Sequence, residues 1–399
     1  MDADEARMIG WRVRQLRDAR GKSLRVLAGL AKMSYTHLWR IERGEVALDS
    51  LSQIVALAEA LEIAPSDLMR LPVPAPANGQ TDSTIEAVRM ALDAIEDDQP
   101  DGLALPVAML ADQVAQILTH RRGCRFAEVA TALPGLIRNL HTTLVTGTDH
   151  DELLELAVHL HVHVTRMWLV HAAAPTDLLR RVVFLAQRLA RERDEVTTLA
   201  VAGFGVADEL LLAGAFTRGR AKLDSITLPP ATAETAGLVA SLMATHATAA
   251  VLDGRPNDAA APMDAAVELA ERFSTINEVD SLGFVYGPTN AGQERMWLAL
   301  EADDPDQAIG IAQNVKPERH RFPVNRAYYW VHYGRALARV PGHRDDAVRA
   351  FRTAEDIFPT AVLRNSNVRE VLAVLLPGAR RDAIGRELRG MAYRAGLPV

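Results

Sequence analysis

Five side chains between residues 34 and 44 have the types and spacing needed to contact a nucleic acid. Tyr35, Thr36, Trp39, Arg40 and Arg43 fall on the outer side of a predicted short helix. Hydroxyl and guanidinium groups can hydrogen-bond to base edges, and guanidinium groups also bind phosphate oxygens. The pattern therefore indicates a helix that meets duplex DNA.

Two short helices joined by a tight turn must position these side chains. Ser23 is a natural N-cap for the first helix and Ser34 for the second, and Gly44 is a natural stop. The predicted apolar faces consist of Leu27, Ala28 and Ala31 in the first helix and Leu38 and Ile41 in the second. This layout places the second helix in the major groove when it binds DNA.

Charge supports the same interpretation. Residues 7–43 contain ten Lys and Arg against Asp18 and Glu42, whereas the whole chain carries a net charge of -7. Two capped helices with a turn also occur in many all-α proteins, but a basic end on an acidic chain favours nucleic-acid binding. Arg12, Lys22 and Arg25, with Arg43, are the residues expected to attract phosphates.

The stretch LAGLAKMSYTHLWRIERG (27–44) resembles the helix-turn-helix of phage-repressor-like regulators, the Xre family. The resemblance implies that Tyr35, Thr36 and Arg40 meet bases. It also implies that Arg17 and Glu42 form a pair that ties the first helix of the domain to the recognition helix.

Two positions depart from the family pattern. Leu24 stands where the family often has a DNA-contacting Gln, which weakens the expected contact. Lys32 stands where the family often has Gly, in a turn whose left-handed geometry costs more for a residue with a Cβ.

The whole chain fits a soluble protein of more than one unit. It has 399 residues, of which 49% are hydrophobic and 24% charged. It shows no apolar run of transmembrane length and begins MDADEARM, unlike a secretory signal, so we expect a cytoplasmic protein without membrane contact. Cys124 is the sole cysteine, which excludes an intramolecular disulfide and argues against a thiolate zinc site.

We predict an all-α fold with two domains. A five-helix helix-turn-helix domain spans 5–70, with helices near 4–19 and after Ser50 and a last short turn that begins at Pro65. A proline-rich linker follows at 71–82. The segment 83–399 is expected to be helical throughout, with helices near 84–97, 104–121, 126–144, 149–172, 176–192, 194–217, 232–251, 257–273, 289–302, 304–314, 324–339, 344–357, 367–376 and 381–395.

The stretch from Trp330 to Pro359 resembles a tetratricopeptide repeat. The matching positions are Trp330, Tyr333, Gly334, Leu337, Ala347, Phe351, Ala354 and Pro359. Three further stretches, 126–144, 286–315 and the C-terminus, resemble actinobacterial regulators with an Xre head and a tetratricopeptide-like body. The resemblance implies an α-solenoid at 83–399 that senses a ligand, dimerises, or does both.

Other chemistry finds little support. Among His159, His161 and His163 only the first and last share a helical face, and no carboxylate completes a metal site. The sequence lacks nucleotide-binding and nucleophile motifs, so we expect no enzyme, metal or cofactor.

Residues 283–290, GFVYGPTN, mix aromatic and polar side chains before a helix, either as an inter-repeat loop or as part of a ligand groove. The candidate groove residues are Tyr286, Thr289, Asn290, Arg326, Tyr329 and Trp330. We therefore expect a homodimeric transcriptional regulator of double-stranded DNA whose body senses a peptide or small molecule. The alternative, favoured by Leu24, is a helical-repeat adaptor whose head serves assembly.

Overall fold

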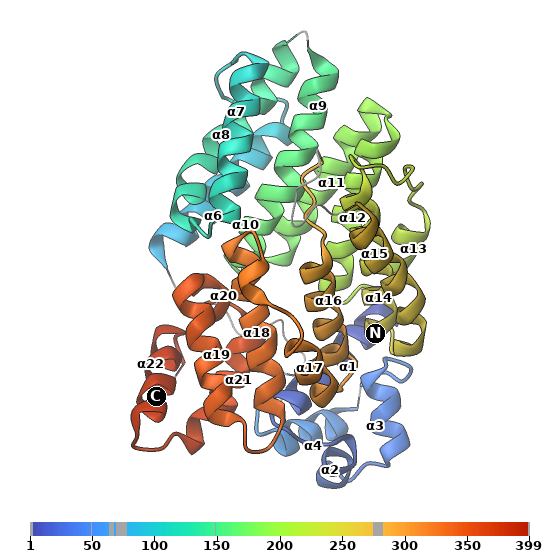
Figure 1. Ribbon diagram of the computed structural model, residues 1–399, viewed down its shortest axis with the longest axis vertical. Helices are drawn as coiled ribbons and strands as arrows, with labels where there is room; N and C mark the ends of the chain where they lie inside the picture. The colour runs from blue at the N-terminus through green and yellow to red at the C-terminus, as the bar shows by residue number, and fades with distance from the viewer. Residues whose placement is uncertain are drawn as a thin grey trace.

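The computed structural model describes residues 3–48, 50–63, 68, 78–147, 149–273 and 282–397. Every regular element in these ranges is a helix, as the sequence predicts, and the helices form a curved, layered molecule (Figure 1). None of the described helices combines the length and the apolarity that a bilayer crossing requires.

The N-terminal head contains α1 (Ala3–Ala19), α2 (Leu24–Leu30), α3 (Tyr35–Glu42) and α4 (Leu51–Leu61). Its apolar core is built from all four helices and is separate from the cores of the body; it includes Ile9, Val13, Leu16, Leu27, Leu38, Ile41, Leu57 and Leu61. The predicted turn that begins at Pro65 and most of the predicted linker lie outside the described residues. Leu68 is described and is buried in this core.

The body runs from α6 to α22. Its first half contains α6 (Gly79–Glu96), α7 (Val107–Arg122), α8 (Phe126–Thr146), α9 (His150–His159), α10 (Arg166–His171), α11 (Thr176–Arg193), α12 (Val196–Leu212), α13 (Phe216–Asp224) and α14 (Ala236–Leu252). Its second half contains α15 (Ala260–Phe273), α16 (Pro288–Glu301), α17 (Pro305–Ala312), α18 (Pro323–Arg339), α19 (Arg344–Ile357), α20 (Pro359–Leu363), α21 (Ser366–Leu375) and α22 (Ala383–Arg394).

Helices that follow one another in the chain pack as pairs, and the pairs stack into a solenoid-like body. The pairs α7 and α8, α11 and α12, α14 and α15, α16 and α17, and α18 and α19 are in extensive contact. In Figure 1 the body descends from α7, α8 and α9 at the top to α19, α21 and α22 beside the head.

Two predicted helix boundaries are wrong for local reasons. The helix expected over 194–217 is two helices, because α12 ends at Leu212 and Gly214 takes a left-handed backbone (φ 77°) before α13. The helix expected from residue 84 begins at Gly79, because the Asn78 side chain accepts a hydrogen bond from the Thr81 amide (3.1 Å). The end of the predicted linker is therefore helical.

The pair α18 and α19 has the close crossing that the sequence predicts. An added Cβ on Gly334 would lie 2.8 Å from the Phe351 ring. Phe351 itself is fully buried in the C-terminal core. A residue without a side chain is thus required at position 334.

We predict that Gly334→Ala lowers the free energy of unfolding by about 1–3 kcal/mol, because the methyl group overpacks the crossing. Gly310→Ala in α17 is the matched control, since nothing lies within 4 Å of its added Cβ. The control should leave stability unchanged or raise it slightly. Equal urea-unfolding midpoints for the two variants would contradict this account of the crossing.

Candidate nucleic-acid interface

The turn between α2 and α3 has the geometry expected of a helix-turn-helix. The Ser23 hydroxyl accepts a hydrogen bond from the Val26 amide (3.2 Å), and the Ser34 hydroxyl accepts one from the His37 amide (3.1 Å). Lys32 takes a left-handed backbone (φ 53°), as the sequence comparison at this position predicts. Both caps and the turn therefore fix where α3 begins.

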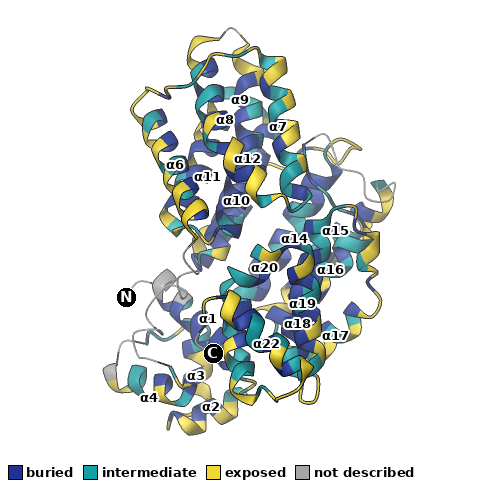
Figure 2. Cartoon of the chain, turned by 90° about the vertical axis from the view of Figure 1, so that its left-hand side faces the viewer, coloured by how far each residue is buried: buried dark blue, intermediate teal, exposed yellow. Residues whose placement is uncertain are grey.

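The outer face of α3 is open to solvent. Leu38 and Ile41 are buried in the head core, whereas Tyr35 is 52% exposed and Trp39 39% exposed. Thr36 and Arg40 are also exposed. In Figure 2 the head lies at the lower end of the molecule, with exposed residues along its outer helices. These four side chains are accessible to a duplex in this arrangement.

Arg40 and Arg43 are placed differently. The Arg40 side chain is half exposed and makes only a long ion pair with Glu45 (3.6 Å). The Arg43 guanidinium lies 4.5 Å from the centre of the Trp39 ring and donates a hydrogen bond to the Gly254 carbonyl of the body (2.6 Å). Arg40 is therefore available, and Arg43 is held at the junction of head and body.

A hollow of about 390 Å³ lies where the α2–α3 turn meets α4. Its lining includes Lys32, Ser34, His37 and Gln53, and a hydrogen bond joins His37 Nε2 to Gln53 Nε2 (3.1 Å). The N-terminus of α3 opens onto this hollow. Helix N-termini and cationic side chains both favour an anion.

The predicted pair between α1 and the recognition helix is present. Arg17 donates two hydrogen bonds to the Glu42 carboxylate, with Nε–Oε1 at 2.8 Å and Nη2–Oε2 at 3.1 Å. Both side chains are buried. This bidentate contact fixes the end of α3 against α1.

The residues expected to attract phosphates are divided. Arg25 is exposed. The Lys22 ammonium is bound to the Ala60 carbonyl (2.8 Å) and to the Glu62 carboxylate (3.0 Å). Arg12 is buried and paired with Glu370 of the body at 2.5 Å, so in this arrangement it cannot reach DNA.

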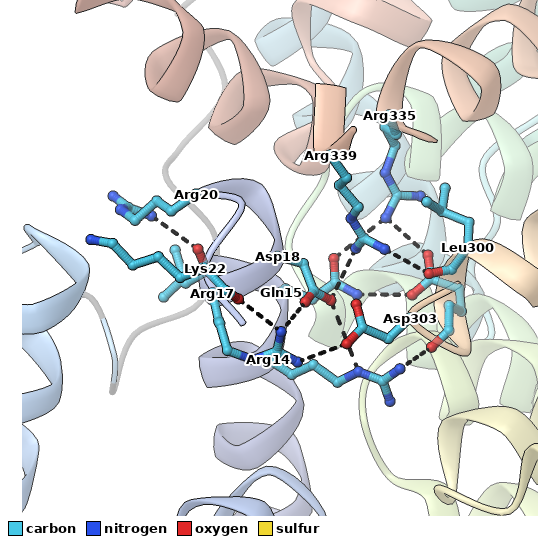
Figure 3. Close-up of polar contacts among 12 residues, drawn as sticks. Arg14, Gln15, Arg17, Asp18, Arg20, Lys22, Leu300, Asp303, Arg335 and Arg339 are labelled. Carbon is cyan, nitrogen blue, oxygen red and sulfur yellow. Dashed lines mark hydrogen bonds and ion pairs between the residues drawn. The ribbon is translucent and has the colours of Figure 1, made fainter. Parts of the chain in front are cut away.

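Sequence reasoning missed what the polar face of α1 does. Gln15 donates a hydrogen bond to Glu301 of α16 (2.8 Å), and Arg335 of α18 donates to the same carboxylate (2.9 Å). Arg339 pairs with Asp18 at 3.0 Å (Figure 3). The head is thus joined to the body by a buried polar network.

Further contacts surround this network. Arg17 reaches Asp303 (3.3 Å), and Arg14 donates a hydrogen bond to the Glu301 backbone carbonyl (Figure 3). Burial opposes ionisation of Glu301, but Arg335 and Arg339 outweigh it and hold the pKa of this carboxyl below its ordinary value. The network therefore contains an ionised carboxylate enclosed by guanidinium groups.

The candidate groove residues do not form one cluster. Tyr286 and Asn290 are half-buried near Glu294, and the Tyr286 hydroxyl and Asn290 Oδ1 have no hydrogen-bond partner among the described residues. Tyr329 is buried, and its hydroxyl donates to the Ala312 carbonyl (3.0 Å), which makes it part of the α17–α18 packing. Trp330 packs edge-on against Tyr329 in the same place. Thr289 precedes Asn290 at the start of α16, and Arg326 lies elsewhere, in α18.

The three histidines flank and occupy a π-helical turn, Leu160–Thr165, that interrupts the helix predicted over 149–172. His161 Nε2 lies 2.9 Å from His141 Nε2, and the rings of His159 and His163 meet edge to face. Burial lowers the pKa of His141 to about 4. No group of three metal-ligating side chains occurs within the described part of the chain.

The fold and this site define a protein with an N-terminal helix-turn-helix domain and a helical body. A family model for a helix-turn-helix domain matches residues 9–71. No curated protein sequence matches the chain. Among solved structures, the chain is similar to ComR from S. thermophilus in its apo form, with 15% identity, a TM-score of 0.30, and coverage of 78% of this chain and 95% of that one.

A second similar structure is ComR from S. thermophilus in complex with DNA and its signalling peptide ComS. It shows 15% identity, a TM-score of 0.29, and coverage of 82% of this chain and 98% of that one. The helix-turn-helix match covers the head alone.

We predict that Glu301→Gln loosens the head from the body, because it leaves the buried Arg335 without its counter-charge, a change that costs about 3 kcal/mol. Small-angle scattering should show a larger radius of gyration. Glu268→Gln, at an exposed position of α15, is the matched control. If the two variants scatter identically, the network does not hold the head.

Proposed function

We propose that this protein is a cytoplasmic, sequence-specific DNA-binding transcriptional regulator. The observation that carries the proposal is the exposed outer face of α3, because its neighbours Leu38 and Ile41 are fully buried and fix its orientation. Tyr35, Thr36 and Arg40 then point away from the head core. The helix-turn-helix match over residues 9–71 supports the same function.

In the mechanism proposed here, α3 enters the major groove and its N-terminal half reads base edges. Arg40 is suited to a bidentate contact with guanine, and Tyr35 and Thr36 to hydrogen bonds or to contact with a thymine methyl group. Trp39 adds a contact beside them. Ser34 and the hollow at the start of α3 receive a backbone phosphate, with Arg25 as a further cation.

A single head offers few base contacts, so we propose that the active form is a homodimer on a pseudo-palindromic site. Arg43 and Lys22 bind DNA only if they leave the partners they have here, Gly254 and Glu62. Their contribution is therefore linked to how the head sits on the body.

The body is proposed to be a tetratricopeptide-like sensor of a peptide or small molecule. Its unpartnered polar atoms support this, since buried polar groups are normally paired and their pairing by a ligand would be favourable. Tyr286, Asn290 and Thr289 at the start of α16 are candidates for such contacts, as is Arg326.

A specific observation favours the alternative, an adaptor whose head serves assembly. Leu24 packs against the head core instead of offering a polar DNA contact, and Arg12 is committed to the body. Under this alternative the head should bind DNA only weakly and without sequence preference.

We predict that Arg40→Ala weakens binding to the preferred duplex by about 1–3 kcal/mol and relaxes preference at one base pair, because one bidentate base contact is lost. Arg25→Ala is the comparison, and it should weaken binding to all sequences alike while it reduces the salt dependence. Quantitative binding to a panel of single-substituted duplexes measures both effects. A uniform loss for Arg40→Ala would assign this residue to the DNA backbone.

A further inference from the structure

A group of arginines meets where α7, α10 and α18 approach one another inside the body. Arg121 and Arg122 end α7, Arg166 begins α10, and Arg326 lies in the first half of α18. α7 packs against α18 and against the π-helical turn that precedes α10. Four guanidinium groups are thus brought together by segments far apart in the sequence.

Two of these arginines have protein partners that satisfy them. Arg166 pairs with Asp208 at 2.5 Å. Arg122 donates a hydrogen bond to the Gly283 carbonyl (2.6 Å) and lies over the Phe322 ring at 5.0 Å. These contacts fix the two guanidinium groups in place.

Arg121 and Arg326 differ from them. Neither makes a hydrogen bond or ion pair with any residue that the structure describes, and the Nε atom of each is buried without a partner. Burial lowers the pKa of Arg121 to about 9, and the positive charges of Arg122 and Arg166 lower it further. Only Cys124 and Tyr328 act in the opposite direction, and both are neutral at pH 7.

Arg121 and Arg326 face a common point. Burial raises the pKa of Cys124 to about 12, and both arginines oppose that shift, so both guanidinium groups lie near this thiol. Cys124 is half-buried just beyond the end of α7. It marks the place where the two unpartnered cations converge.

The surrounding side chains are also without hydrogen-bond acceptors. His163 and His171 are buried, and the Nε2 atom of each has no partner among the described residues. The rings of His171, Tyr328 and Phe358 pack together, with centroids 5.7 Å and 5.0 Å from that of His171. The site therefore offers cationic and aromatic groups and lacks the negative charge that would balance them.

An unpaired buried cation is costly unless an opposite charge accompanies it. The position of Arg121 in the last turn of α7 accounts for part of its stabilisation through the helix dipole, but not for Arg326, which lies within the first half of α18. We propose that Arg121 and Arg326 bind the carboxylate of a ligand whose apolar part lies against Tyr328 and His171. This inference rests on the sensor role proposed for the body.

A carboxylate fits because its two oxygens can accept hydrogen bonds from both guanidinium groups at once. The carboxylate can belong to the C-terminus of a short peptide or to a free aromatic acid. Both ligands present the same chemistry to Arg121 and Arg326, so the experiment must separate them.

The test is thermal unfolding of the full chain at constant ionic strength with four probes: hexapeptides with free C-termini, the same peptides amidated, phenylacetate, and inorganic phosphate. We expect a carboxylate probe to raise the Tm of the wild type and to have no effect on Arg121→Gln or Arg326→Gln. Peptide binding should weaken at least tenfold on amidation if the peptide C-terminus is the source, whereas stabilisation by phenylacetate would identify a free acid.

Arg125→Gln is the matched control, since Arg125 is exposed near the same turn and has no ion pair with a described residue. It should respond to the probes as the wild type does. Without any probe, Arg121→Gln should unfold at the same or a higher temperature than the wild type, because an uncompensated buried charge has been removed. A structural role for Arg121 would instead lower the Tm.

Three results would overturn the proposal: equal responses of wild type and Arg121→Gln to every probe, stabilisation by phosphate alone, or a lower probe-free Tm of Arg121→Gln with its probe response intact. Failure of the DNA-binding function is separable from these results. It would be seen as a wild type that lacks sequence preference for duplexes with or without the probes.

Discussion

Helix α1 belongs to two cores at once, and this double burial is the constraint on which the rest of the structure depends. Its apolar face, with Val13 and Leu16, closes the core of the head. Its polar face, with Gln15 and Asp18, is buried against the body and bonded to Glu301 and Arg339 (Figure 3). The same helix holds α3 through Arg17, so the position of the recognition helix is coupled physically to the body.

This coupling gives the charge of the head a second meaning. Ten basic residues in 7–43 predict attraction to DNA, yet Arg7, Arg12 and Arg17 are paired with acidic residues of the body, at Asp253, Glu370 and Asp303. Part of the charge asymmetry between the two ends of the chain therefore stabilises the junction between them. The cations left exposed are Arg25 and Arg40 in the helix-turn-helix itself. DNA and the body thus use different faces of one basic domain.

Most of the fold could be predicted from the sequence because its signals are local. Caps at Ser23 and Ser34, the apolar spacing of Leu38 and Ile41, and the pair Arg17–Glu42 all lie within a few turns of one another in the chain or follow a family pattern. The candidate site could not be predicted as fully. Contacts such as Arg43 with Gly254, or the cluster of Arg121 and Arg326, join residues some two hundred positions apart, and nothing in helical periodicity reports them. Tyr329 shows the same limit, since periodicity does not tell a repeat-core tyrosine from a groove tyrosine.

The central claim is that α3 meets duplex DNA with the edge that carries Tyr35, Thr36 and Arg40. The most direct measurement is selection of duplexes from a random pool by the full chain, followed by the salt dependence of binding to the sequence obtained. The account predicts a recurrent motif of two related half-sites and an affinity that falls steeply with salt. A pool that stays random after repeated selection, or an affinity independent of salt, would contradict it.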